Sequence, residues 1–187
     1  MVTVIYLIGL VLVLGGIYLA LRGLGASYLK FRGTRVVTCP ETKEPAAVKV
    51  GTLRATVMEA LGAPELRLNE CTRWPEHRNC GQECLAQIEK APENCLVLNL
   101  LNRWYQGKTC IYCGKPLGVI HWAEHKPALR SPEGVTVEWY EVSPEKVPAV
   151  LASHQPICWD CHIAQTFRRQ FPDRVVERDW KAPVTRK

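Results

Sequence analysis

The chain has 187 residues, nine cysteines and a formal net charge of +6. Thirteen prolines and thirteen glycines predict short elements and many turns and argue against one large sheet. The positive charge does not predict nucleic-acid binding. Four of the basic residues directly follow an apolar N-terminal run, and without them the charge is +2, an ordinary value for a soluble domain.

The N-terminal segment predicts a single transmembrane helix at residues 1–21. Residues 2–21 are twenty residues without a charge, rich in Leu, Val and Ile. As a helix they would extend about 30 Å, which matches the hydrocarbon core of a bilayer. A cleaved secretory signal is the alternative. It would begin with basic residues and carry a shorter apolar run before small residues at a cleavage site, and this chain shows neither feature.

Residues 22–35 read as a basic juxtamembrane segment. No acidic residue precedes Glu41, and four bases follow the apolar run: Arg22, Lys30, Arg32 and Arg35. Positive residues stay on the cytoplasmic side, so we expect the N-terminus outside and residues 22–187 in the cytoplasm. Anionic lipid headgroups are the expected partners of these bases.

Residues 36–107 predict a small cysteine-containing α+β unit. Short strands are expected at residues 35–38, 46–50 and 65–69, and helices at 52–61, 81–90 and 92–105. A turn is expected at residues 39–42 between the first two strands.

The last segment, residues 108–187, holds two Cys-x-x-Cys pairs. These pairs supply four thiolates: Cys110, Cys113, Cys158 and Cys161. Two pairs at this spacing are typical of a closed tetrahedral zinc site. Gly114 suits a tight turn after the first pair, and the second pair opens a helix that Pro172 ends. Between the pairs we expect a hairpin of strands 117–122 and 135–142.

This order of knuckle, hairpin and helix resembles treble-clef and related zinc-knuckle modules. The resemblance is carried by Cys-Ile-Tyr-Cys-Gly-Lys-Pro-Leu at 110–117 and by Cys-Trp-Asp-Cys at 158–161, and it covers about residues 108–172. In such modules four cysteines bind a structural zinc ion, which implies that role for the two pairs here. The modules serve many processes, so the resemblance implies no specific activity.

Haem is an alternative ligand for the second pair. With His162 it forms Cys158-x-x-Cys161-His162, the attachment signature for c-type haem. Attachment would take place on the outer face of the membrane. In a reducing cytosol a high density of cysteine predicts metal ligands, and for that reason zinc is preferred.

Four cysteines of the first unit form a possible second metal site: Cys39, Cys71, Cys80 and Cys84. Zinc or an iron–sulfur cluster would suit them, although their spacing matches neither ferredoxin pattern. A redox pair at Cys80 and Cys84 and ordinary buried thiols are the alternatives. Cys95 precedes an apolar run and is expected in the core.

The predicted fold class is therefore α+β, with one transmembrane helix, a cysteine-rich α+β region and a treble-clef-like zinc module. We find no phosphate-binding loop, dinucleotide turn or nucleophile elbow, and we expect no catalytic residues. The expected function is that of an accessory or assembly subunit of a larger membrane complex. A membrane-anchored electron carrier with an iron–sulfur cluster or haem is the alternative.

Overall fold

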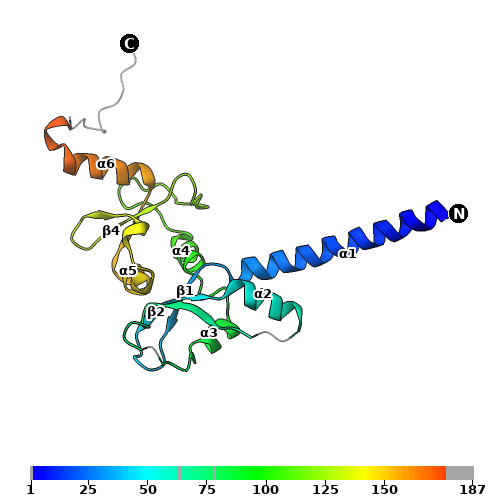
Figure 1. Ribbon diagram of the computed structural model, residues 1–187. Helices are drawn as coiled ribbons and strands as arrows, with labels where there is room; N and C mark the ends of the chain where they lie inside the picture. Colours follow the sequence, from blue (N-terminus) through cyan, green and yellow to red (C-terminus); the bar gives the residue numbers. More distant parts are fainter. Residues whose placement is uncertain (1, 63–64, 78, 176–187) are drawn as a thin grey trace, which may run out of the picture. The chain divides into compact units, whose positions relative to one another are not determined.

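The computed structural model describes residues 2–62, 65–77 and 79–175 (Figure 1). The chain divides into two compact units, each described by itself. Unit 1 comprises Met1–Arg103 and Ser143–Ala149, and unit 2 comprises Trp104–Val142 and Val150–Lys187. The chain thus leaves unit 1 slightly before the boundary expected at residues 107 and 108, and a short later segment returns to it.

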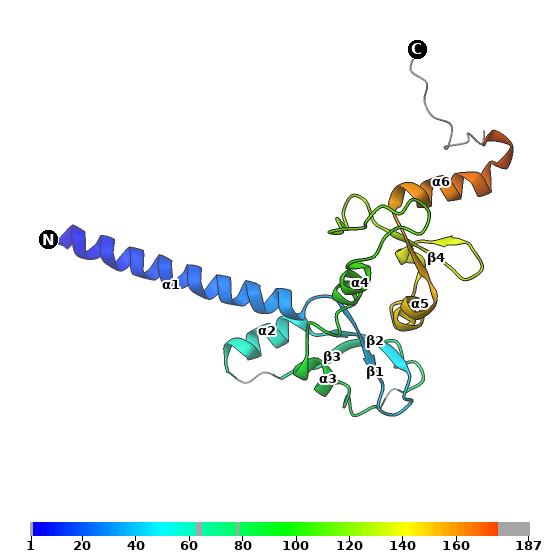
Figure 2. The same cartoon turned by 180° about the vertical axis from the view of Figure 1, so that it is seen from behind.

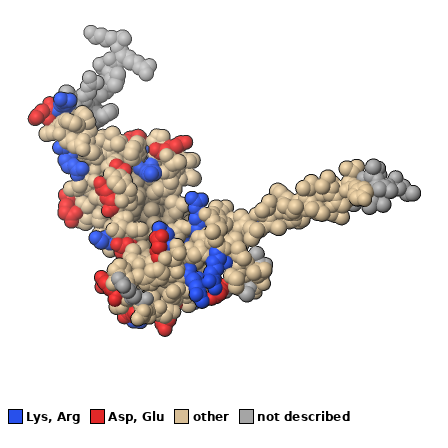
Figure 3. All heavy atoms as spheres, in the orientation of Figure 1, with Lys and Arg blue, Asp and Glu red and all other residues tan. Residues whose placement is uncertain are grey.

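Helix α1 (Val2–Phe31) has 30 residues, or about 45 Å, and includes most of the segment expected to be juxtamembrane. Its described large apolar side chains from Tyr6 to Leu29 are exposed, whereas Phe31 at its end is buried, and by length and composition Gly9–Phe31 could cross a membrane. A signal sequence would meet the same two criteria. On the face seen in Figure 3, the protruding part of α1 carries no charged side chains, and Lys and Arg gather where the helix meets the rest of unit 1.

The end of α1 is fixed to unit 1 by a buried arginine. Arg35 has no exposed surface, and its guanidinium donates hydrogen bonds to the carbonyls of Phe31 (2.7 Å) and Gly33 (3.3 Å) and to that of Lys30. The expectation that Arg35 faces lipid headgroups was wrong, because the free carbonyls at the helix end provide acceptors inside the protein. Lys30 also has a protein partner, Glu59, at 2.6 Å.

Unit 1 contains a three-stranded antiparallel sheet in the order β1-β2-β3. Its strands are β1 (Thr34–Thr38), β2 (Pro45–Val50) and β3 (Leu68–Cys71), close to the ranges expected. The helices are α2 (Thr52–Ala60), α3 (Leu85–Lys90) and α4 (Val97–Tyr105), whose last two residues belong to unit 2. In both views α2 lies alongside the C-terminal end of α1 (Figure 1 and Figure 2). Val37, Val48 and Ile88 are among the buried core residues.

Two helices of unit 1 begin later than expected. Gln82 has a positive φ of 57°, so α3 begins after it, at Leu85. Leu96 forms an isolated β-bridge with Arg35, and the helix expected from Pro92 therefore begins at Val97.

Unit 2 contains a second antiparallel sheet in the order β5-β4-β6. Its strands are β4 (Ala128–Arg130), β5 (Thr136–Val137) and β6 (Gln155–Ile157). The remaining helices are α5 (Val147–Ser153), shared between the units, and α6 (Trp159–Gln170). Short 3-10 turns occupy Trp139–Glu141 (η1), Pro144–Lys146 (η2) and Pro172–Arg174 (η3). The fold is thus a mixture of helices and small sheets.

The hairpin between the cysteine pairs has a different first strand from the one expected and a shorter second strand. Residues 117–122 form no strand, because Gly118 has a positive φ of 58° and Val119 is 83% exposed. The hairpin joins β4 and β5 through the turn that begins at Ser131. Its second strand ends at Val137, because Glu138 and Glu141 form a capping box that starts a 3-10 turn.

Candidate metal centre

Four cysteines of unit 2 converge on one point. Their sulfur atoms all lie within 4.8 Å of one another, and we call this set the CxxC group: Cys110, Cys113, Cys158 and Cys161. In a tetrahedral zinc site with Zn–S bonds of about 2.3 Å, neighbouring sulfurs lie about 3.8 Å apart. The Sγ atoms of Cys113 and Cys158 are 3.7 Å apart. The spacing and the donor set fit one metal ion with four thiolate ligands.

The first pair lies in a tight backbone turn. A β-bridge between Thr109 and Pro116 closes the loop, and the Cys110 N–H donates to the Lys115 carbonyl at 2.9 Å. Gly114 follows the pair with a φ of 70°, and its N–H donates to the Cys110 carbonyl at 2.9 Å. A side chain at this φ would be strained, which explains the glycine.

The second pair begins helix α6. Cys158 is the N-cap residue, with extended backbone angles, and Cys161 lies in the first turn. Strand β6 immediately precedes the pair, and the Ile111 N–H donates to the Pro156 carbonyl at 3.2 Å, which links the two cysteine pairs through the backbone. The free N–H groups and the dipole of a helix N-terminus favour thiolates there.

The protonation of the CxxC group shows why a cation would suit it. Burial raises the pKa of Cys110, but backbone N–H groups of Cys158, Cys113 and Tyr112 outweigh this effect and bring that pKa down to about 6. Burial and the neighbouring thiols raise the pKa values of Cys158 and Cys161. Four thiolates this close repel one another, so full ionisation requires a bound cation.

His162, the residue proposed as a haem ligand, follows the group on α6. Its side chain is 5% exposed, and its Nε2 lies 3.1 Å from a carboxylate oxygen of Glu138. Its Nδ1 is buried and, among the described residues, has no hydrogen-bond partner. The imidazole is thus engaged by Glu138, and no local pattern predicts this contact because the two residues are 24 positions apart in the chain.

The other predicted ligands belong to unit 1. They line a cavity of about 30 Å³, which we call the cysteine cavity: Cys39, Cys71, Cys80 and Cys84. Within the described part of the chain, sulfurs of these residues do not form a group within 4.8 Å as the CxxC group does. His77 lines the same cavity.

These findings establish a cysteine cluster that could bind a metal ion and one helix that could cross a membrane. The donor set suits both zinc and iron, since both accept four thiolates in tetrahedral geometry. In comparisons with known proteins, no family model, no curated protein and no solved structure matches this chain.

Proposed function

We propose that this chain is a single-pass membrane protein whose unit 2 is built around a structural zinc ion, and that it serves as an accessory or assembly subunit of a larger membrane complex. The observation that carries the proposal is the convergence of the four sulfurs of the CxxC group within 4.8 Å. Zinc with four protein ligands has no open coordination position and therefore stabilises a fold without binding substrate. When bound, it supplies folding free energy to the unit that holds it.

The order of elements supports a module of the treble-clef kind. A cysteine turn comes first, the β4–β5 hairpin follows, and the second pair lies at the start of α6. Strand β6 adds to this order and places Cys158 directly beyond the sheet. The ligands of the proposed zinc site thus come from the two parts of unit 2 that the sheet holds together.

Electron transfer is the second candidate function, since four thiolates also bind iron. The geometry favours a metal ion bound by four thiolates over haem attached to the second pair. The sulfurs of Cys158 and Cys161 lie within 4.8 Å of those of the first pair. The His162 Nε2, which would have to bind a haem iron, lies 3.1 Å from a carboxylate oxygen of Glu138. Colour separates the candidates, because zinc centres are colourless and iron centres are not.

We further propose that α1 runs from outside to inside and leaves both units in the cytoplasm. Arg22 and Arg32 are exposed near the end of α1 and support this orientation by the positive-inside rule. A reducing cytosol would also keep the thiols available for metal. A reporter enzyme that is active only in the cytoplasm, fused after Lys187, should be active. An inactive cytoplasmic reporter together with an active external one would reverse the orientation.

Exposed apolar surface supports membrane lipid and other membrane-protein subunits as partners. Leu53 and Val57 of α2 and its C-cap residue Leu61 recur every four residues and are 75%, 52% and 73% exposed. In α1, Gly9 and Gly15 leave open space where a Cβ would stand, which allows a second helix to approach closely. No nucleic-acid partner is proposed.

The test is elemental analysis of the full chain, purified in detergent without oxygen, together with its visible spectrum. We expect zinc and no colour, and loss of one equivalent of zinc in Cys113→Ser, because that residue belongs to the CxxC group. Cys95→Ser is the matched control, since Cys95 lies outside both cysteine sets. Iron with visible absorbance that disappears in Cys113→Ser would replace the zinc proposal by electron transfer.

A further inference from the structure

The topology of unit 1 brings two cysteines to the same end of its sheet. Strands β1 and β3 both pair antiparallel with β2, so they run in the same direction. Cys39 follows the last residue of β1, and Cys71 is the last residue of β3. Both therefore lie where these strands end, and both line the cysteine cavity.

Side-chain amides tie the segments of the other two cysteines to this sheet, one at the first residue of β3 and one at the last residue of β1. The Gln82 side-chain oxygen accepts a hydrogen bond from the Leu68 N–H at 3.0 Å, which ties the segment between Cys80 and Cys84 to β3. The Gln87 amide accepts from the Thr38 N–H (3.0 Å) and donates to the Thr38 carbonyl (2.7 Å), which ties α3 to β1. The hydrogen bonds of Gln82 and Gln87 thus position the segments that carry these cysteines, and none of these bonds involves a thiol.

The backbone around Cys39 repeats the pattern of the first CxxC pair. The Cys39 sulfur accepts N–H hydrogen bonds from Thr42 and Glu41, three and two residues later. The Cys110 sulfur accepts them from Cys113 and Tyr112, at the same two offsets. Such donors stabilise a thiolate before any metal binds, although here Thr42 takes the place of the second cysteine.

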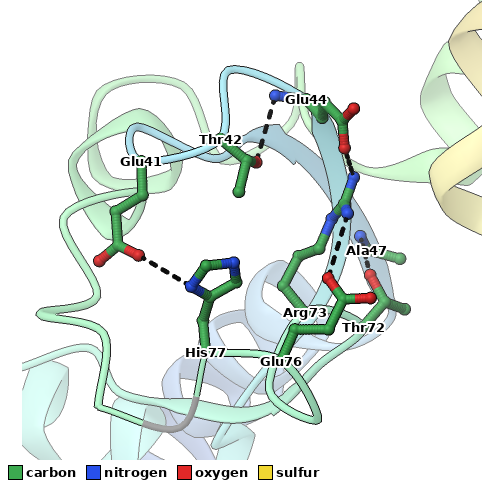
Figure 4. Close-up of polar contacts among 8 residues, drawn as sticks. All are labelled: Glu41, Thr42, Glu44, Ala47, Thr72, Arg73, Glu76 and His77. Carbon is green, nitrogen blue, oxygen red and sulfur yellow. Dashed lines mark hydrogen bonds and ion pairs between the residues drawn. The ribbon is translucent and has the colours of Figure 1, made fainter.

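The basic side chains near the cysteine cavity are paired with acidic ones and therefore do not oppose the binding of a cation. Arg73 forms ion pairs with Glu44 and Glu76, and the ring nitrogen Nδ1 of His77 lies 3.5 Å from Glu41 (Figure 4). Both basic side chains therefore have acidic partners of their own. All four cysteines line this one cavity, in which Cys84 is buried and the other three are partly exposed.

We propose that Cys39, Cys71, Cys80 and Cys84 bind a second soft metal ion, of the chemical class of zinc, in the cysteine cavity. Its volume of about 30 Å³ exceeds the 10–15 Å³ or so that one water-sized sphere occupies. The sulfurs move inward when the ion binds, since they do not yet meet the spacing of the CxxC group. This site is independent of the zinc site in unit 2.

The experiment counts zinc in the full chain and in matched variants, all purified in detergent without oxygen. We expect two equivalents in the original protein and in Cys95→Ser, and one equivalent in Cys80→Ser and in Cys39→Ser. Cys39 and Cys80 lie outside the helices and are partly exposed, so serine is tolerated at both positions. The equivalent that unit 2 retains shows that unit 2 of each variant is folded, and slow amide hydrogen exchange in β2 shows the same for unit 1.

Three results would overturn this second site. One is a single equivalent in the original protein that Cys80→Ser keeps and Cys113→Ser loses, which would leave the proposed function intact. Another is two equivalents that persist in both Cys80→Ser and Cys39→Ser. The last is iron with acid-labile sulfide that disappears in Cys80→Ser, which would assign the cavity to a cluster.

Discussion

Replacing Cys161 by serine should unfold unit 2 and leave unit 1 folded. The reason is the composition of the buried cluster around the metal centre. Three of its five members belong to the CxxC group, and only Ile157 and Leu117 are not cysteines. Without the metal, this part of unit 2 has little else to hold it together.

The magnitudes support this expectation. Fully burying one Ile or Leu side chain contributes about 1.5–3 kcal/mol, and Leu117 is only half-buried. A structural zinc ion contributes roughly 10–16 kcal/mol of apparent binding free energy in small peptides. Loss of that term is comparable to the whole stability of an ordinary domain, about 5–15 kcal/mol. Removing one ligand weakens zinc binding enough to tip unit 2 toward the unfolded state.

Amide hydrogen exchange followed by mass spectrometry can measure this effect in each unit separately. In the original protein we expect slow exchange in β4 and β6 of unit 2 and in β2 of unit 1. In Cys161→Ser the strands of unit 2 should exchange rapidly while β2 stays protected. Cys95→Ser, which changes a partly buried thiol outside both cysteine sets, should resemble the original protein.

The reasoning would be refuted by slow exchange in β4 and β6 of Cys161→Ser with no metal in unit 2. That result would mean that packing and hydrogen bonds alone stabilise the unit. The buried Tyr105, which bridges the Ala128 carbonyl (3.0 Å) and the Trp139 indole N–H (2.9 Å), would then be the main alternative source of stability.

Three further perturbations test the end of α1, the aromatic core of unit 2 and the protonation of the thiols. Arg35→Met leaves the carbonyls at the end of α1 without their buried donor and should lower the free energy of unfolding of unit 1, measured with urea, by about 2 kcal/mol. Arg32→Met, at an exposed position, is the control and should leave this free energy unchanged. Tyr105→Phe should cost unit 2 about 1–3 kcal/mol, because a buried indole N–H and a carbonyl lose their partner, and equal stabilities would contradict this. Zinc affinity, measured against a chelator, should rise with pH through neutrality, because Cys158 and Cys161 have raised pKa values and must lose protons to bind zinc. An affinity that does not change with pH would contradict those pKa directions.

The cysteines of the CxxC group could be predicted from the sequence because the signal of each pair is local. A separation of three residues turns both sulfurs of a pair to the same side, whatever the rest of the chain does. The strands of unit 1 were predicted for the same reason, since the alternation in residues 46–50 and the turn at 39–42 lie within short windows. The convergence of the two pairs, 44 residues apart, depends on β6, a strand of three residues that includes Pro156 and has no recognisable pattern.

The errors of sequence interpretation have tertiary causes. Arg35 looked like a base at the membrane surface, because nothing in its neighbourhood shows that the carbonyls at the end of α1 turn toward it. Residues 117–122 looked extended, but the positive φ of Gly118 interrupts that conformation. The contact between His162 and Glu138 joins residues from α6 and the end of the hairpin, and only the fold brings them together.

The distribution of cysteines follows from the size of the two units. Each has roughly half of a chain of 187 residues, and small units bury too little apolar surface to be stable without added cross-links. All nine cysteines are free thiols in the structure. Outside the cell, disulfides would provide the missing stability, but a reducing compartment excludes them and leaves metal ions as the available cross-link. If both units face the cytoplasm, bound metal therefore takes the structural role of disulfides, and the protein should lose its fold to a chelator but not to a reducing agent.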